Sequence, residues 1–182
     1  MTNLTSVNNG TVSLYAKWNI NSYTLSLTAS PASYGSVSGA GTYSYNTNAT
    51  VNANPQPWCS FVSWSDGGSK THSVTVSKNM SLTATFKLIN FTVTVSTGAA
   101  DASGGGSFGY QRSTTVQTSN VSLPTRTGYK IGSWTFAGWT GSTTQPSING
   151  STVTIPAKTY GNILITPTWV QDLISITYHR NA

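Results

Sequence analysis

The residues that could carry acid–base or nucleophilic chemistry are few in this chain of 182 residues, which has three acids, two histidines and one cysteine. They are Asp66, Asp101, Asp172, His72, His179 and Cys59. A hydrolase needs a pair of carboxylates, or a nucleophile beside an oriented base. The aspartates lie in three separate segments, and no motif orients His72 toward Cys59. We therefore expect no catalytic residues, no bound metal and no cofactor.

The positive charge of the chain does not indicate a nucleic-acid partner. Nine basic residues give a net charge of +6, but they are spread singly along the sequence, without a basic run or an RNA-binding aromatic motif. The high isoelectric point follows more from missing acids than from abundant bases. We expect no specific nucleic-acid binding. No apolar run approaches the length of a membrane span, and the first residues do not form a secretion signal, so we expect any signal or anchor to lie outside this segment.

The elements that would position any site are strands. The apolar residues are mainly valine, isoleucine, leucine, tyrosine and tryptophan, and they alternate with serine and threonine. A composition of 37% hydrophobic residues can build a core. No stretch of ten residues has helical periodicity. We predict a mainly β fold with little or no helix, including a hairpin at the Asp66-Gly67 turn.

An internal repeat organises the chain. Three segments share an apolar start, a small central residue and an aromatic end, namely residues 14–18, 82–86 and 165–169. An alternating strand begins five residues after each aromatic end, at Tyr23, Phe91 and Ile174. Residues 61–67 and 136–141 form a further matched pair. Such ordered correspondences indicate tandem modules.

We place two complete modules at residues 19–86 and 87–169. Residues 1–18 would contain the C-terminal strand of a preceding repeat, and residues 170–182 would start a following one. The aromatic positions that recur should fill the core once per module, with Trp64 and Trp139 as equivalent buried residues. The repeat-core positions are Trp18, Phe61, Trp64, Phe86, Tyr129, Phe136, Trp139 and Trp169.

These motifs resemble a known family of repeats. The first module contains Gly-Ser-Val-Ser-Gly at residues 35–39, Phe-Val-Ser-Trp-Ser-Asp-Gly at 61–67 and Leu-Thr-Ala-Thr-Phe at 82–86. It is similar to the divergent relative of the internalin-type B-repeat, also called the Listeria–Bacteroides repeat. The second module, with Gly-Tyr at 128–129 and Phe-Ala-Gly-Trp at 136–139, resembles the B-repeat itself. It departs from the pattern at residues 131–135, which look inserted.

The resemblance implies small β-grasp-like modules in tandem, strung along secreted or cell-surface bacterial proteins. Such modules act there as stalks, spacers or adhesive segments, and the family has no catalytic residues to transfer. We expect an extracellular location, with neighbouring repeats and a surface protein or glycan as partners. A carbohydrate-binding module is the alternative, because Trp58 and Trp134 lack a partner in the other module. Exposed rings would favour this alternative, and buried rings would remove its support.

The ends of the chain carry a separate expectation. A strand without a partner leaves a row of unpaired backbone groups. We expect residues 11–18 to be ordered against the first module, because Trp18 lies only five residues before Tyr23. We expect residues 174–178 to be the less stable end.

Overall fold

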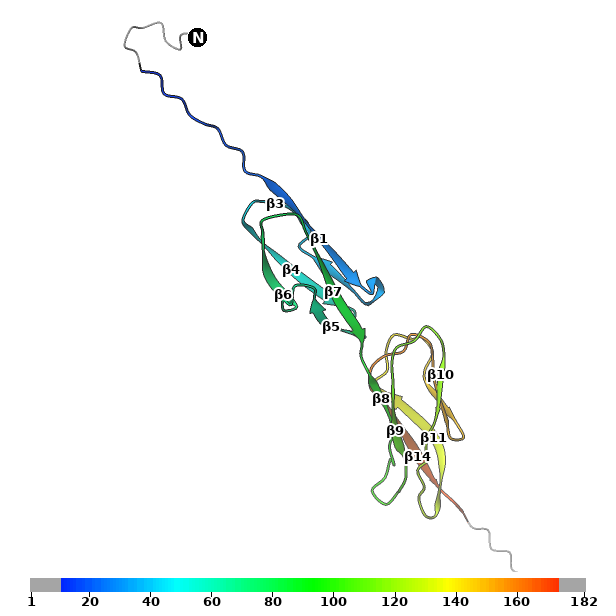
Figure 1. Cartoon of the computed structure of the whole chain (residues 1–182). Helices are drawn as coiled ribbons and strands as arrows, with labels where there is room; N and C mark the ends of the chain where they lie inside the picture. Colours follow the sequence, from blue (N-terminus) through cyan, green and yellow to red (C-terminus); the bar gives the residue numbers. More distant parts are fainter. Residues whose placement is uncertain (1–10, 174–182) are drawn as a thin grey trace, which may run out of the picture.

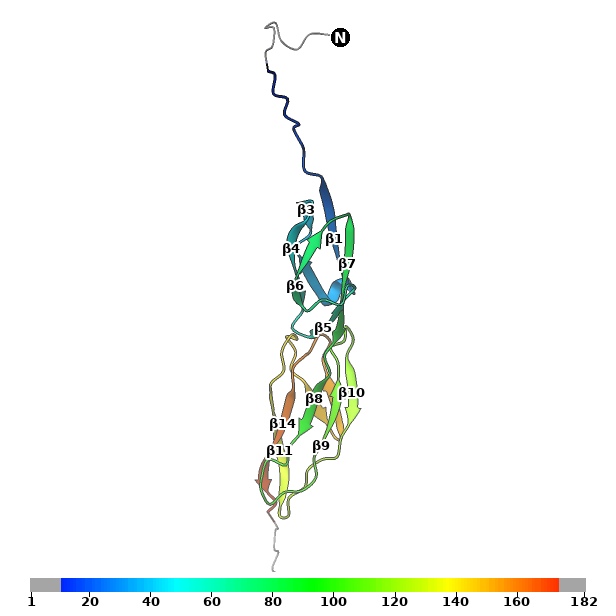
Figure 2. The same cartoon turned by 60° about the vertical axis from the view of Figure 1, so that its left-hand side comes forward.

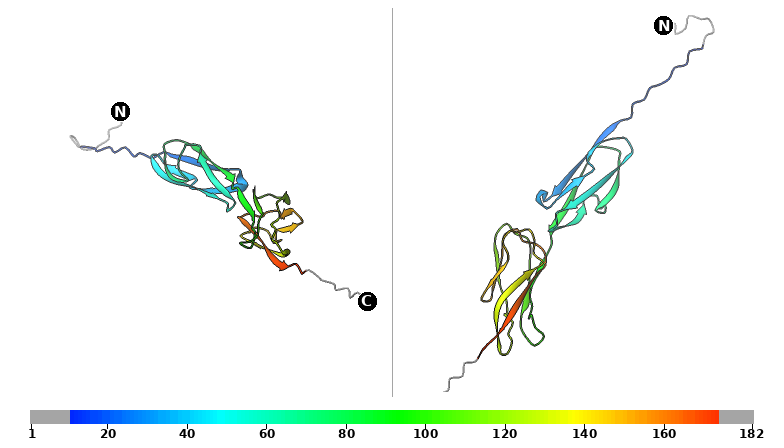
Figure 3. Two further views of the ribbon diagram at one scale, coloured as in Figure 1. Left: turned by 90° about the horizontal axis from the view of Figure 1, so that it is seen from below. Right: turned by 180° about the vertical axis from the view of Figure 1, so that it is seen from behind.

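The computed structural model describes residues 11–173, which form two β units arranged end to end (Figure 1). The two ends of the described chain lie at opposite ends of the molecule in every view (Figures 2 and 3). Strands dominate both units, as predicted. The single helical element is one 3₁₀ turn, so no helix among these residues is long enough to cross a membrane.

The first unit consists of two antiparallel-rich sheets that enclose a core. Its elements are β1 (Ser22–Ser30), η1 (Ala32–Tyr34), β2 (Gly35–Ser38), β3 (Gly41–Ser44), β4 (Thr47–Pro55), β5 (Cys59–Trp64), β6 (Thr71–Val76) and β7 (Met80–Leu88). The strand orders are β3-β1-β7-β5 and β2-β4-β6. Alternate residues of β4 and β7, including Val51 and Ala84, are buried. The period-two pattern of the sequence therefore turns one face of each sheet to the core.

The second unit has the same plan with shorter strands in its smaller sheet. Its elements are β8 (Phe91–Val95), β9 (Gly106–Tyr110), β10 (Gln117–Asn120), β11 (Tyr129–Ala137), β12 (Ser147–Asn149), β13 (Thr152–Ile155) and β14 (Ile163–Gln171). The orders are β11-β14-β8-β9 and β10-β13-β12. Its core is built from aliphatic residues such as Val93, Val153 and Ile165. Sequence patterns did not identify β9, β10 or β12, which are short and polar.

The four-stranded sheets of the two units have matching strand order and register. In the first, β1 lies parallel to β7 with Leu27 opposite Leu82. In the second, β8 lies parallel to β14 with Val95 opposite Ile165. The closing strand of each unit, β7 or β14, thus lies in the middle of its sheet, between the first strand and β5 or β11.

The register of the paired strands shows that Trp64 and Trp139 do not occupy equivalent positions in the two units, contrary to our expectation. On β5, Trp64 lies opposite Ala84, just beyond a register shift that follows Phe61. On β11, the same shift follows Ile131, and it is Trp134 that lies opposite Pro167, the central residue of the closing strand. Residues 131–134 therefore replace the Phe-x-x-Trp element. Because β11 continues to Ala137, Phe136 belongs to an extension of this strand, and Trp139 follows it outside the strand.

The expectation for residues 11–18 was wrong. Residues 11–20 form no strand and are exposed, and Trp18 is 88% exposed rather than in a core. The reason is topological, because β3 and β7 already occupy both sides of β1 and leave no edge there for a further strand. The segment expected to start a following repeat, residues 174–178, lies outside the described residues.

Candidate functional site

The recurrent aromatic residues serve mainly as core residues. Trp64 and Phe86 are 2% and 3% exposed. Phe61 packs against the first core, and Phe136, Trp139 and Trp134 pack against the second. Two others are held in place by polar neighbours. The Trp169 indole N–H donates to the carbonyl of Thr97 at 2.9 Å, and the Arg126 guanidinium lies 3.7 Å from the ring centre of Tyr129.

Neither tryptophan proposed as a glycan contact presents a free ring. Trp134 packs on the second core and has a counterpart in Trp64, so the premise that it lacked a repeat partner was wrong. Trp58 lies between the two units, with the Arg112 guanidinium 4.0 Å from its ring centre and the Tyr160 ring centre at 5.3 Å. These contacts give Trp58 a structural role and remove the observation that motivated a flat aromatic platform.

Among residues 11–173, the one short contact between a histidine and an acid is in the first unit. His72 Nε2 lies 2.9 Å from Asp66 Oδ2, and His72 Nδ1 lies 2.9 Å from the carbonyl of Ser69. Burial raises the pKa of Asp66, but hydrogen bonds from His72 and from the backbone N–H of Gly68 outweigh it and hold that pKa below its ordinary value. This arrangement closes the turn between β5 and β6.

The other groups with potential chemistry are not assembled into a site. Cys59 is buried in β5, where burial raises its pKa and the charge of Arg112 partly opposes that shift. Asp101 pairs with Arg126 at 2.9 Å on the surface of the second unit. Within the described part of the chain, no three His, Cys, Asp or Glu residues gather as metal ligands. The polar side chains therefore do not form a catalytic constellation there.

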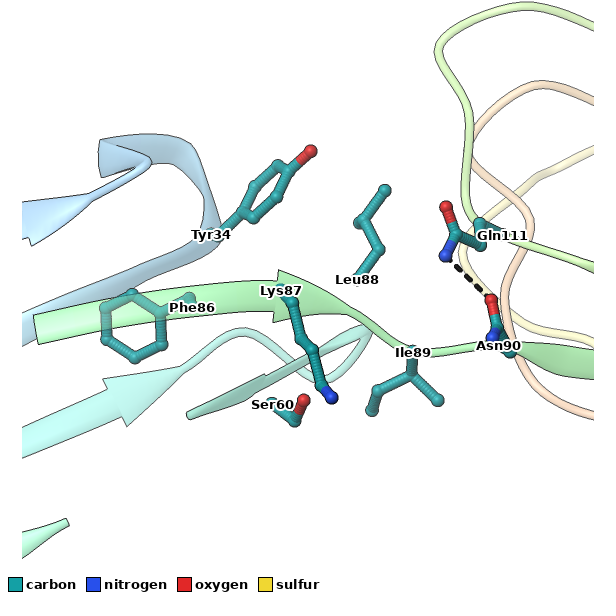
Figure 4. Close-up of a pocket in the computed structure, with 8 residues that line it drawn as sticks. All are labelled: Tyr34, Ser60, Phe86, Lys87, Leu88, Ile89, Asn90 and Gln111. Carbon is teal, nitrogen blue, oxygen red and sulfur yellow. Dashed lines mark hydrogen bonds between the residues drawn. The ribbon is translucent and has the colours of Figure 1, made fainter. Parts of the chain in front are cut away.

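The junction between the units brings together residues far apart in the sequence. Only Ile89 and Asn90 separate the end of β7 from the start of β8. The backbone N–H of Ile89 donates to the carbonyl of Trp58 at 3.0 Å. The Gln111 side-chain amide donates to Asn90 Oδ1 at 2.7 Å (Figure 4). Hence both units contact the linker directly.

Two adjoining hollows lie at this junction. One, of about 530 Å³, is lined by Tyr34, Ser60, Phe86, Lys87, Leu88, Ile89, Asn90 and Gln111 (Figure 4). The other, of about 480 Å³, is lined by Ser33, Tyr34, Trp58, Leu88, Gln111, Arg112, Ser113, Thr114 and Gln117. They share Tyr34, Leu88 and Gln111. Each contains one cation, and neither is lined by a carboxylate.

Sequence reasoning singled out Trp58 but missed its partners. Arg112 looked like one of several scattered cations, and Tyr160 had no distinguishing neighbour. The one available signal was the Pro-Gln-Pro segment at residues 55–57, which departs from the family's pattern and precedes Trp58, the residue just before β5. Nothing in the local sequence around Arg112 indicates that it would meet this ring, because the contact depends on how the two units are joined.

Comparison with known proteins gives a match for the first unit. Residues 23–90 match the model of the divergent InlB B-repeat domain. This range begins in β1 and ends in the linker, so it covers the strands of the first unit except for Ser22, the first residue of β1. No curated protein and no solved structure matches the chain.

Proposed function

We propose that this chain is a non-catalytic segment of a bacterial surface or secreted protein, in which two successive repeats act as a stalk or spacer. The proposal assigns residues 19–86 and 87–169 to two copies of one repeat. The second copy is supported by its strand order β9-β8-β14-β11, which matches the order β3-β1-β7-β5 of the first unit strand by strand. Its equivalent register at the closing strand adds to this support.

The end-to-end arrangement of the units carries the spacer role (Figure 1). A spacer must keep its two ends apart. A linker of two residues and side-chain contacts across the junction favour this, because both restrict bending between the units. Trp58 from the first unit fits between Arg112 and Tyr160 of the second. Because aromatic and cation–π contacts of this kind stabilise an interface, they should limit the angle between the units. The polar faces of the strands would be available for contact with a surface protein or glycan.

Residues 14–18 fit the same proposal as the closing strand of a preceding repeat. In the described units the closing strand lies at the centre of a sheet. Its apolar side chains would then be buried by strands of that other repeat. This assignment accounts for the exposure of Leu14, Tyr15 and Trp18 in residues 11–20. An exposed apolar segment of this kind indicates an interaction.

Small-angle X-ray scattering tests the spacer role. The wild-type chain should show the narrow distance distribution of an elongated particle. Trp58→Ala should broaden it and shorten the mean distance between the units, because the linker would then be free to bend. Tyr45→Ala, which removes an exposed ring of the first unit, is the matched control and should leave the distribution unchanged. A wild-type distribution as broad as that of Trp58→Ala would refute a rigid spacer.

A further inference from the structure

We propose that the two hollows at the junction form a binding site for an acidic saccharide, with Arg112 as the residue that binds a sugar carboxylate. The site goes beyond the spacer role. It exists only where both units meet, because Trp58 and Tyr34 come from the first unit and Arg112 and Gln117 from the second.

Arg112 has the properties of an anion-binding residue. Its guanidinium carbon lies over the Trp58 ring, 4.0 Å from the ring centre, and this cation–π contact holds the group at the junction. Within residues 11–173 it forms no salt bridge, and its Nε is buried without a hydrogen-bond partner. Because no carboxylate among these residues neutralises its charge, the guanidinium is available to pair with an anion in the hollow. The fork of an arginine matches the two oxygens of a carboxylate.

The electrostatic surroundings also favour an anion. The hollow next to that of Arg112 contains Lys87, so the site offers two separate positive groups. The three aspartates of the chain are engaged elsewhere, with His72, Arg126 and Lys130. An anion bound at the junction would therefore meet attraction from both cations without a lining carboxylate to repel it.

The remaining lining fits a sugar ring better than a simple ion. Ser113, Thr114 and Gln117 supply hydroxyl and amide groups around the guanidinium. The Gln117 amide N–H donates to the carbonyl of Gln111 at 2.8 Å, which orients the side chain and leaves its oxygen to accept a hydroxyl. Tyr34 and Leu88 provide an apolar wall. Hollows of about 480 and 530 Å³ can each hold a sugar residue.

The two adjoining hollows, each with one cation, suggest that successive acidic residues of one glycan chain bind together. Trigalacturonate is a suitable probe because it has one carboxylate per ring. Its fully methyl-esterified form has the same rings without charge and is the matched ligand control. A triaspartate peptide carries the same charge on a different backbone. Isothermal titration and amide chemical-shift mapping on the full chain would measure binding of all three.

Trigalacturonate should bind and shift the amides of residues 111–117 and of Trp58. Arg112→Gln should weaken binding at least tenfold, and Lys78→Gln, which removes an equal charge from the turn before β7, should not weaken it. Arg112→Lys keeps the charge but not the fork, so it should give intermediate affinity. It also keeps the test informative if Arg112→Gln loosens the junction, which the scattering of each variant would reveal.

Several results would overturn the site. Equal binding of the methyl ester would exclude a carboxylate anchor, and equal binding of the triaspartate peptide would exclude a saccharide-specific site. Shifts confined to other surfaces, or no binding at millimolar ligand, would also refute it. An elongated wild-type particle that fails to bind would refute the site and leave the spacer role intact. A wild-type particle that is flexible alone, but whose distance distribution narrows when trigalacturonate binds, would refute the spacer role and keep the site.

Discussion

Each of the two units has a four-stranded sheet with the same strand arrangement, but different side chains fill the two cores. The first core contains the buried rings of Trp64 and Phe86, whereas the buried residues of the second are mostly valine and isoleucine. Trp134, the counterpart of Trp64 by register, is only half-buried. The comparison shows that strand order and the position of the closing strand specify this fold. The side chains that fill the space between the sheets can vary as long as that space is filled.

The smaller sheets differ more than the larger ones. In the first unit, β2 pairs with β4 over four residues, whereas in the second the related contact is a single bridge between Ser103 and Thr125. The second unit instead adds β12, which forms a hairpin with β13 through the turn at Gly150. The differences between the units therefore lie in the smaller, three-stranded sheet, and the four-stranded sheet keeps its strand order. Loops at the edge of a domain tolerate such changes at low cost.

The difference in aromatic packing predicts the largest effect. Trp64→Ala should destabilise the first unit by about 3 to 5 kcal/mol, because it leaves a cavity opposite Ala84 and removes the indole bond to the Lys70 carbonyl. Trp134→Ala should cost the second unit about 2 kcal/mol, because less of its surface is buried. Calorimetry that separates the two unfolding transitions would measure both. Equal losses would show that the two positions are equally buried in solution.

The units should also differ in their response to alkali. Burial raises the pKa of Tyr110 to about 12, and its hydroxyl donates to the carbonyl of Gly161 at 2.6 Å. A pKa raised by folding gives stability that is complete below the ordinary value of about 10 and is lost as the pH rises through 12. The second unit should lose up to about 2 kcal/mol in this window.

Urea unfolding at pH 9 and pH 11.5 would measure this loss. Tyr110→Phe should remove most of the pH dependence. Tyr43→Phe is the matched control, because Tyr43 lies opposite Tyr23 as Tyr110 lies opposite Phe91. An alkaline loss that persists in Tyr110→Phe would assign it to another group.

Acid should affect the first unit more than the second. The pKa of Asp66 is lowered by folding, so its contribution is present above about pH 4 and is lost as the pH falls through the folded value. The pair with His72 is partly exposed, so the effect should be at most about 1 kcal/mol. Unfolding of Asp66→Asn at pH 3 and pH 6 would measure it. A loss of stability between pH 6 and pH 3 that is as large in this variant as in the wild type would assign it to another group.

The smallest expected effect is on the rate at which Cys59 reacts with a thiol reagent, and not on the free energy of unfolding. Cys59 is 4% exposed, and burial raises its pKa, so both access and thiolate formation are limited. Labelling with a thiol reagent at pH 8 should be slow in the native chain and should speed up in Trp64→Ala. It should not change in Trp134→Ala, because the thiol belongs to the first unit. Fast labelling of the native chain would contradict the buried position.

Much of the fold could be predicted from the sequence because it follows from local periodicity. Alternation of apolar and polar residues gave the long strands of both units and excluded helices. The matched segments at residues 82–86 and 165–169 located the two closing strands, β7 and β14. A turn does lie at Asp66 and Gly67, with Gly67 at positive φ, but the predicted hairpin was wrong, because β5 pairs with β7 and β6 pairs with β4 in the other sheet. These features depend on residues that are close together in the sequence.

Other features depended on contacts between distant residues. The similar motifs at residues 61–64 and 136–139 suggested that Trp139 is the counterpart of Trp64. The strand register instead places Trp134 at that position, because the register shift after Ile131 sets which residue lies opposite Pro167. Residues 11–18 read as a strand, yet a strand needs an edge, and β1 has none free. The sequence by itself determined the strand content, the closing strands and the scarcity of catalytic groups. Only the tertiary structure brought Trp58, Arg112 and Tyr160 together, because that contact requires two units to meet at a short linker.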